Sequence, residues 1–175
     1  MPHSIETLTI QTADAYHWVN RLIDSIPAEK WEETPPVLET NVTWQIGHLL
    51  MSFYYHSILV VAGHQMDVVS KIPLKEYNEL YTLAPAANSA GKVNPNSLRE
   101  HLNLVQQKSI EVIQSLKSED LEQALIPTPI THPIAKTKFE ALDWNIKHSM
   151  YHCGQLGILK RVLDQRFDFG LRMNQ

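Results

Sequence analysis

Residues 139–163 read FEALDWNIKHSMYHCGQLGILKRVL, and apolar side chains recur there at the spacing of a helix. Placing successive residues 100° apart puts His148 and His152 within the apolar side, where a helix normally carries Leu or Ala. This predicted buried side also holds Ala141, Trp144, Gln155, Leu156, Leu159, Val162 and Leu163. The opposite side holds Glu140, Asp143, Lys147, Tyr151, Gly154 and Arg161. Two histidines inside an apolar stripe require a specific explanation.

The spacing of this histidine pair is typical of metal ligands. Side chains four residues apart on a helix are neighbours, with Cβ atoms roughly 5–6 Å apart. Both imidazoles can then bind one metal ion at about 2.0–2.1 Å. His148 is followed by Ser-Met-Tyr, so the zinc-protease pattern, with a Glu directly after the first His, is absent. A metal site on this helix needs a third ligand from elsewhere in the chain.

The composition indicates an ordinary globular protein. The chain has 175 residues, a formal net charge of −4 and a single cysteine, Cys153. Its charges are scattered, so nucleic acid is not an expected partner. The N-terminus lacks the pattern of a signal peptide, and the most apolar run, residues 46–62, is broken by Gly, His and Ser. We therefore expect one domain, residues 1–175, in the cytoplasm and with no membrane span. Cys153 points about 100° away from His152 on the helix, which favours a small buried hydrophobe over a nucleophile.

Three further amphipathic helices are predicted over about residues 4–26, 41–62 and 96–117. Candidate N-caps are Asn41 or Thr43, Asn96 or Ser97, and Thr137 for the last helix. The helix over residues 41–62 is apolar around most of its circumference, which indicates burial on more than one side. No strand pattern is present. The sequence therefore predicts an all-α fold, a four-helix bundle with long connections between helices.

The connections themselves carry little regular structure. Residues 27–41 read as an extended segment that Trp31 holds against the bundle. A short helix is predicted around residues 74–81 of the long connection that follows. Residues 126–133 contain three prolines and cannot be helical. Connections of this length allow helices that are not consecutive in the chain to pack side by side.

Two short stretches together resemble the DinB-like superfamily: TWQIGHL at residues 43–49 and HSMYHCGQL at residues 148–156. That superfamily is related to the bacillithiol S-transferases and the mycothiol-dependent maleylpyruvate isomerases. Its members are four-helix bundles that hold a divalent metal with three histidines. The resemblance implies that His48 is the metal ligand from the second helix and that His148 and His152 are the pair from the fourth, at one end of the bundle.

The residues around His48 agree with this assignment. His48 shares a side of its predicted helix with Trp44, the side expected to face the core. His56 is the alternative third ligand, but it lies about 80° around the helix from His48 and is expected to point to a different neighbour. The remaining histidines have no paired spacing and are assigned to surface or loop positions: His3, His17, His64, His101 and His132.

Three neutral imidazoles suit Zn²⁺ or Ni²⁺, with Fe²⁺ as a further option, better than Mg²⁺ or Ca²⁺. No fourth protein ligand is evident, which leaves a position open for water or substrate. The resemblance implies a metal-dependent transferase that activates a small-molecule thiol, or water, for attack on a small electrophile. A non-catalytic metal-binding or stress-associated module, and a helical interaction protein without metal, are the alternatives. No carboxylate shares the histidine side, so no general base is assigned.

Four residues are assigned to the candidate substrate pocket: Trp44, Tyr55, Trp144 and Gln155. The two tryptophans each lie one turn before a candidate ligand, and core packing is their alternative role. Met150, Gly154 and Ile158 lie together on the outward side of the last helix. Small and apolar residues on an outward face favour contact with a second subunit, so we expect a homodimer.

Overall fold

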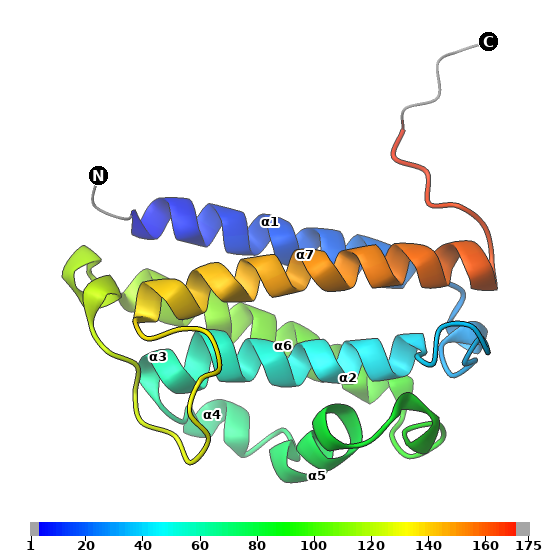
Figure 1. Cartoon of the computed structure of the whole chain (residues 1–175), viewed down its shortest axis with the longest axis horizontal. Coiled ribbons are helices and arrows are strands. Elements are labelled where there is room, and N and C mark those ends of the chain that lie inside the picture. Colours follow the sequence, from blue (N-terminus) through cyan, green and yellow to red (C-terminus); the bar gives the residue numbers. More distant parts are fainter. Residues whose placement is uncertain (1–3, 171–175) are drawn as a thin grey trace.

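A computed structural model describes residues 4–170, and in that part of the chain the fold is helical, with no β-strand. Four long helical segments run along the molecule (Figure 1). They are α1 (Ile5–Ser25), α6 (Pro95–Ser115), α7 (Lys138–Leu163) and a segment composed of α2 (Val42–Phe53), η2 (Tyr54–Leu59) and α3 (Val60–Ala62). The predicted all-α fold is confirmed.

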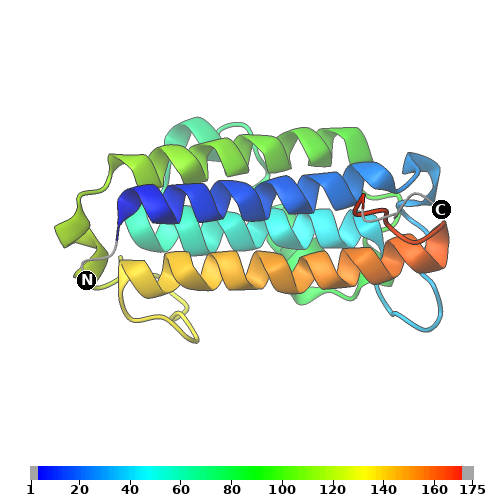
Figure 2. The same ribbon diagram turned by 90° about the horizontal axis from the view of Figure 1, so that it is seen from above.

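The long helices do not pack in chain order. α1 contacts α6 and α7, and α2 contacts the same two helices. α1 and α7 run in one direction while α2 and α6 run in the other (Figures 1 and 2). Long connections make this arrangement possible, because neighbouring helices that are parallel cannot be joined by a tight turn. As a result α2 and α7, which carry the histidines, lie side by side.

Hydrogen-bonding side chains mark where these helices begin. Asn41 caps α2 as predicted, and Thr137 caps α7 in a reciprocal capping box with Glu140. The predicted N-cap of α6 at residue 96 or 97 is two or three residues late. The side chain of Asn94 caps this helix and Pro95 is its first residue, a position that proline favours because no intrahelical N–H is needed there.

Short helices occupy the connections. They are η1 (Ala28–Lys30), α4 (Met66–Val69), α5 (Leu74–Asn78), η3 (Glu79–Leu83), η4 (Ala86–Asn88) and η5 (Ser118–Glu122). α5 and η3 confirm the predicted short helix, whereas the single turn α4 was not predicted, and η1 lies within residues 27–41, which were predicted to be extended. Trp31 is buried as expected, and its indole N–H donates to the carbonyl of Ile26 at 3.0 Å. Residues 126–133 are non-helical, as their prolines require.

None of the helices in the described part of the chain has the length and apolar character of a membrane span.

The buried side of α7 differs from the prediction. It is centred near Ser149 rather than His148, and Val162, predicted to be buried, is 49% exposed. The shift occurs because polar side chains on α7 find partners in the interior. Asn145 donates to the hydroxyl of Tyr16 at 3.0 Å, and Ser149 donates to a backbone carbonyl of its own helix. His148 therefore lies at the border of the buried side, while His152 lies within it.

Candidate metal centre

Three histidines from two helices converge between α2 and α7. His48, His148 and His152 each offer a ring nitrogen, and these three atoms lie within 4.8 Å of one another. The Nε2 atoms of His148 and His152 are 3.0 Å apart. His148 and His152 lie near the middle of α7, so the cluster is placed along the length of the bundle rather than at the end where we expected it.

The ring of His48 is oriented by the backbone of η3. Its Nδ1 lies 2.8 Å from the carbonyl oxygen of Tyr81. A carbonyl can only accept, so this Nδ1 carries the proton and Nε2 keeps its lone pair. Trp44 stacks on the ring, with centroids 4.7 Å apart and planes at 11°, and its own indole N–H donates to the carbonyl of Ala84. Both the tautomer and the plane of His48 are therefore set by its neighbours.

The side chain of a glutamine fixes the tautomer of His152. The Nδ1 of His152 lies 2.6 Å from Oε1 of Gln45. The amide nitrogen of Gln45 donates to Gln155 at 2.8 Å and to Thr40 at 3.0 Å, and in this arrangement its oxygen faces the histidine. His152 therefore holds its proton on Nδ1 and presents an unprotonated Nε2. Sequence reasoning missed Gln45. The sequence feature that could have indicated Gln45 is a side-chain amide one turn before His48 on a largely apolar helix.

The distance between the Nε2 atoms of His148 and His152 fits a shared metal ion. Two nitrogens bound to one ion at about 2.1 Å lie about 3.0–3.4 Å apart for bond angles of 90–109°. The 3.0 Å between His148 and His152 is within this range. Because Nε2 of His152 is unprotonated, only a proton on His148 or a cation makes so close an approach favourable. Trp144 stacks on His148 with planes at 11°, and the buried Nδ1 of His148 has no hydrogen-bond partner among the described residues.

Burial keeps the three rings neutral. It lowers the pKa of His152 to about 3 and that of His148 to about 4, with smaller contributions from the neighbouring histidines. The pKa of His48 is also lowered by burial, although the carbonyl of Tyr81 opposes the shift. Only a neutral imidazole can bind a metal ion, so all three are ready to do so at neutral pH.

Comparison with known protein families gives a match to the DinB superfamily over residues 11–156. The chain belongs to the DinB superfamily. The matched range includes all three histidines of the cluster and covers most of the 175 residues. No curated protein matches this DinB chain.

A second histidine pair lies beside the cluster of the DinB chain. His56 and His132 share a hydrogen bond of 2.8 Å, and the ring centroid of His56 is 5.7 Å from that of His148. We expected His132 at a surface or loop position; it does lie in a loop, but it is only 7% exposed. The loop folds inward because Tyr55 stacks on His132, with planes at 9°, and donates its hydroxyl hydrogen to the carbonyl of Ile130.

The position of His56 depends on a π-helical turn. It lies in η2, where each turn contains more residues than in an α-helix. An angle calculated at 100° per residue therefore overstates how far His56 lies from His48. His56 does have its own partner, as predicted, but that partner lies next to the cluster. Of the other histidines, His17 and His64 are exposed, His101 is half-buried and His3 lies outside the described residues.

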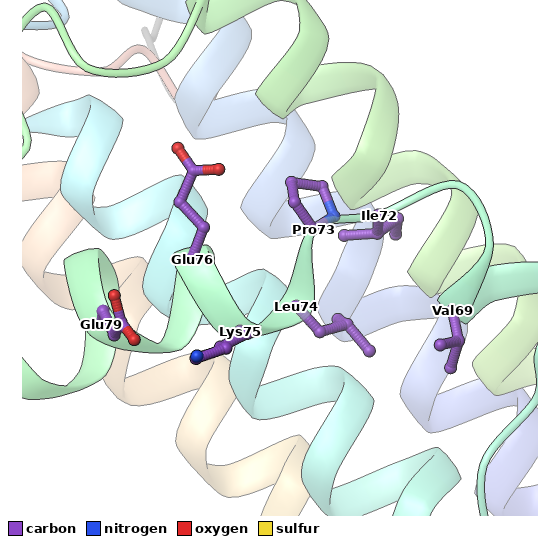
Figure 3. A pocket seen from close by; sticks show the side chains of 7 residues that line it. All are labelled: Val69, Ile72, Pro73, Leu74, Lys75, Glu76 and Glu79. Atoms are coloured by element: carbon purple, nitrogen blue, oxygen red, sulfur yellow. The ribbon is translucent and has the colours of Figure 1, made fainter.

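Two other features of the DinB chain are not part of the histidine cluster. A hollow of about 490 Å³ adjoins α5 and is lined by Val69, Ile72, Pro73, Leu74, Lys75, Glu76 and Glu79 (Figure 3). The charged ends of its Lys and Glu side chains point in different directions rather than to a common point.

Cys153 is buried, and burial raises its pKa to about 12, so the thiol stays protonated. This agrees with its predicted role as a packing residue.

Proposed function

We propose that this DinB chain, as a single domain of residues 1–175, is a metal-dependent enzyme that activates a small-molecule thiol, or water, for attack on a small electrophile. His48, His148 and His152 would hold a divalent transition metal through their Nε2 atoms. One observation carries the proposal: neighbouring oxygen atoms fix the protons of His48 and His152 on Nδ1, which leaves their Nε2 lone pairs free in the cluster.

The donor set supports the choice of metal. Three neutral imidazole nitrogens favour Zn²⁺ or Ni²⁺, with Fe²⁺ as a further option. Such an ion would supply Lewis acidity that lowers the pKa of a thiol or of water enough to give a nucleophile at neutral pH. Three protein ligands leave at least one coordination position for the reactant.

The surrounding side chains have distinct proposed roles. Trp44 and Trp144 stack on two of the ligand rings, so they hold those rings in place and wall the candidate substrate pocket. Tyr55 contributes to the candidate substrate pocket by holding the adjacent loop, because its hydroxyl donates to the carbonyl of Ile130. Gln155 accepts a hydrogen bond from the amide nitrogen of Gln45 and so orients the side chain that contacts His152. No carboxylate among residues 4–170 hydrogen-bonds to a cluster histidine, so the nucleophile's proton is not assigned to a carboxylate base.

We also propose a homodimer, located in the cytoplasm. Met150, Tyr151, Ile158 and Val162 are 46–64% exposed along one side of α7, and Gly154 lies among them. An apolar strip of this kind on a helix is a suitable contact for a second copy of the same helix. Sedimentation velocity tests this, because Ile158→Glu is expected to convert a dimer into a monomer. A wild-type monomer at micromolar concentration would contradict the proposal.

The alternative is a non-catalytic metal-binding module. The 3.0 Å between the Nε2 atoms of His148 and His152 supports a bound cation whether or not chemistry follows. In that case chelation lowers the melting temperature, but no thiol-dependent turnover occurs with any electrophile.

Elemental analysis of protein purified without an affinity tag is the deciding experiment. The expected result is about one transition-metal ion per chain, and the ion should be lost in His148→Ala and His152→Ala. His17→Ala is the matched control because His17 is exposed on α1. Thiol-dependent turnover should follow metal content across these variants. Metal-free wild-type protein with full activity would overturn the proposal.

A further inference from the structure

We propose that His56 is a ligand-binding residue of this centre, and that its Nε2–H, held in one tautomer by His132, donates a hydrogen bond to a small anion bound beside the three clustered histidines. The inference deepens the proposed function and rests on it, since the anion would occupy the open side of the metal site. It is independent of which metal and which thiol the protein uses.

The tautomer of His132 is set by the backbone. The amide N–H groups of Ile134 and Ala135 lie 3.2 and 2.8 Å from Nδ1 of His132. Both groups can only donate, so this Nδ1 must carry a lone pair. A neutral His132 therefore has its proton on Nε2. That Nε2 lies 2.8 Å from Nδ1 of His56, so His132 is the donor and His56 is the acceptor.

The proton of His56 is then fixed as well. Its Nδ1 accepts from His132, which leaves Nε2 as the protonated nitrogen. Nε2 lies on the far side of the imidazole from Nδ1. Although His56 as a whole is only 7% exposed, its Nε2 is not among the fully buried side-chain atoms that lack a hydrogen-bond partner, so this donor is open to water or to a ligand.

The neighbours of His56 place this donor beside the metal site. Its ring is 5.7 Å from that of His148 with planes at 87°, so the two rings meet edge to face. His56 is not within the group of ring nitrogens that can share one ion, which argues against a fourth ligand. A neutral ring with a single fixed donor recognises a hydrogen-bond acceptor. Small anions such as a thiolate or a carboxylate therefore fit this position.

Azide binding to the Co²⁺-loaded protein tests the inference, with the visible absorption of Co²⁺ as the readout. His56→Phe is expected to bind Co²⁺ with unchanged stoichiometry and affinity but to bind azide about tenfold more weakly. His17→Phe is the control and should match wild type in both measurements. An unchanged azide affinity in Co²⁺-loaded His56→Phe overturns the inference. Loss of Co²⁺ from this variant also overturns it, because that result would make His56 a metal ligand. Failure of the wild-type protein to bind Co²⁺ would overturn the proposed function itself.

A second pair of variants isolates the part played by His132. His132→Gln keeps an N–H that can donate to His56 and should retain most of the azide affinity, whereas His132→Phe should lose part of it. The ¹⁵N ring shifts of the metal-free wild-type protein report the tautomers directly, without any variant. They should show His56 and His132 both protonated on Nε2. Protonation of either ring on Nδ1 would overturn the inference even if the azide result agreed.

Discussion

A β-carbon placed on Gly47 would lie 2.3 Å from the ring of Tyr81, so the lack of a side chain at Gly47 is what lets η3 pack closely against α2. The same Tyr81 supplies the carbonyl that accepts from His48, the next residue along α2. Gly47 and His48 are thus connected through one neighbour, Tyr81. Gly47 contributes to the histidine cluster without being part of it.

We expect Gly47→Ala to weaken metal binding, because the added methyl group must push Tyr81 and its carbonyl away from His48. Tyr81 is fully buried, so the displacement should also cost about 1–3 kcal/mol of unfolding free energy. Isothermal titration with Zn²⁺ and urea unfolding measure the two effects. Gly157→Ala is the matched control, since a β-carbon there meets nothing within 4 Å. Equal Zn²⁺ affinity in the two variants would contradict this account.

Tyr81→Phe separates the backbone of Tyr81 from its hydroxyl. The hydroxyl is buried and has no hydrogen-bond partner among the described residues. Its removal should leave the carbonyl, the ring packing and Zn²⁺ affinity unchanged, and should keep or raise the unfolding free energy. Thermal unfolding and Zn²⁺ titration of this variant check the result. A large loss of Zn²⁺ affinity would show that the hydroxyl, rather than the carbonyl, matters to the site.

Gln45→Leu should lower metal affinity by about 10–100-fold, the usual cost of losing a partner that orients a metal-bound histidine. His152 would then have no acceptor for its Nδ1–H and could turn. Gln155→Leu should have a smaller effect, because Gln45 keeps its bond to Thr40. Competition with a chromophoric chelator measures both affinities. Gln114→Leu, at an exposed position of α6, is the control.

Removal of the metal should lower the melting temperature of the wild-type protein. An ion present at 100 times its dissociation constant stabilises the folded state by about 2.7 kcal/mol. For a chain of this size that corresponds to roughly 5–10 °C. Differential scanning calorimetry before and after dialysis against EDTA provides the measurement. His148→Ala should melt at the same temperature under both conditions.

The metal-free protein should lose stability as the pH falls from 7 to 5. Burial lowers the pKa of His56 to about 3, and those of His148 and His152 to similar values, whereas an unfolded histidine titrates near 6.5. The unfolded chain therefore binds more protons in this range. The contribution to stability is complete above about pH 6.5 and is lost as the pH falls toward 3.

Urea unfolding at pH 7, 6 and 5 measures this effect. Each additional proton bound by the unfolded chain changes the unfolding free energy by about 1.4 kcal/mol per pH unit. The carboxylates titrate at lower pH, so the interval from 7 to 5 reports on the histidines. His148→Ala should reduce the slope, and His17→Ala should leave it unchanged. A wild-type unfolding free energy that does not vary with pH would show that these histidines are protonated in the folded state.

Apolar periodicity and capping residues predicted the all-α fold, and the match to the DinB superfamily agrees with that fold. The Asn41 and Thr137 caps are local features, so the sequence is sufficient to locate them. The start of α6 was placed late because Asn94 and Pro95 precede the first apolar residue of that helix. The spacing of His148 and His152 predicted two members of the cluster, and the resemblance supplied His48.

The supporting residues were harder to predict for a physical reason. Tyr81 acts through its carbonyl, a group that every residue carries, so side-chain identity gives no signal. His132 reaches His56 only because a proline-rich loop folds back onto η2, and a π turn moves His56 toward the cluster. These contacts arise from tertiary packing. A helical projection with a fixed angle per residue cannot represent them.

His48 lies 100 residues before His148, and the helices that carry them are brought together only by the long crossovers of the bundle. During synthesis His48 is therefore made well before His148 and His152 emerge from the ribosome. If the three histidines bind a metal as proposed, high-affinity capture would have to wait until α7 has docked against α2. Metal uptake would then be a late event in folding and would report that α7 is in place.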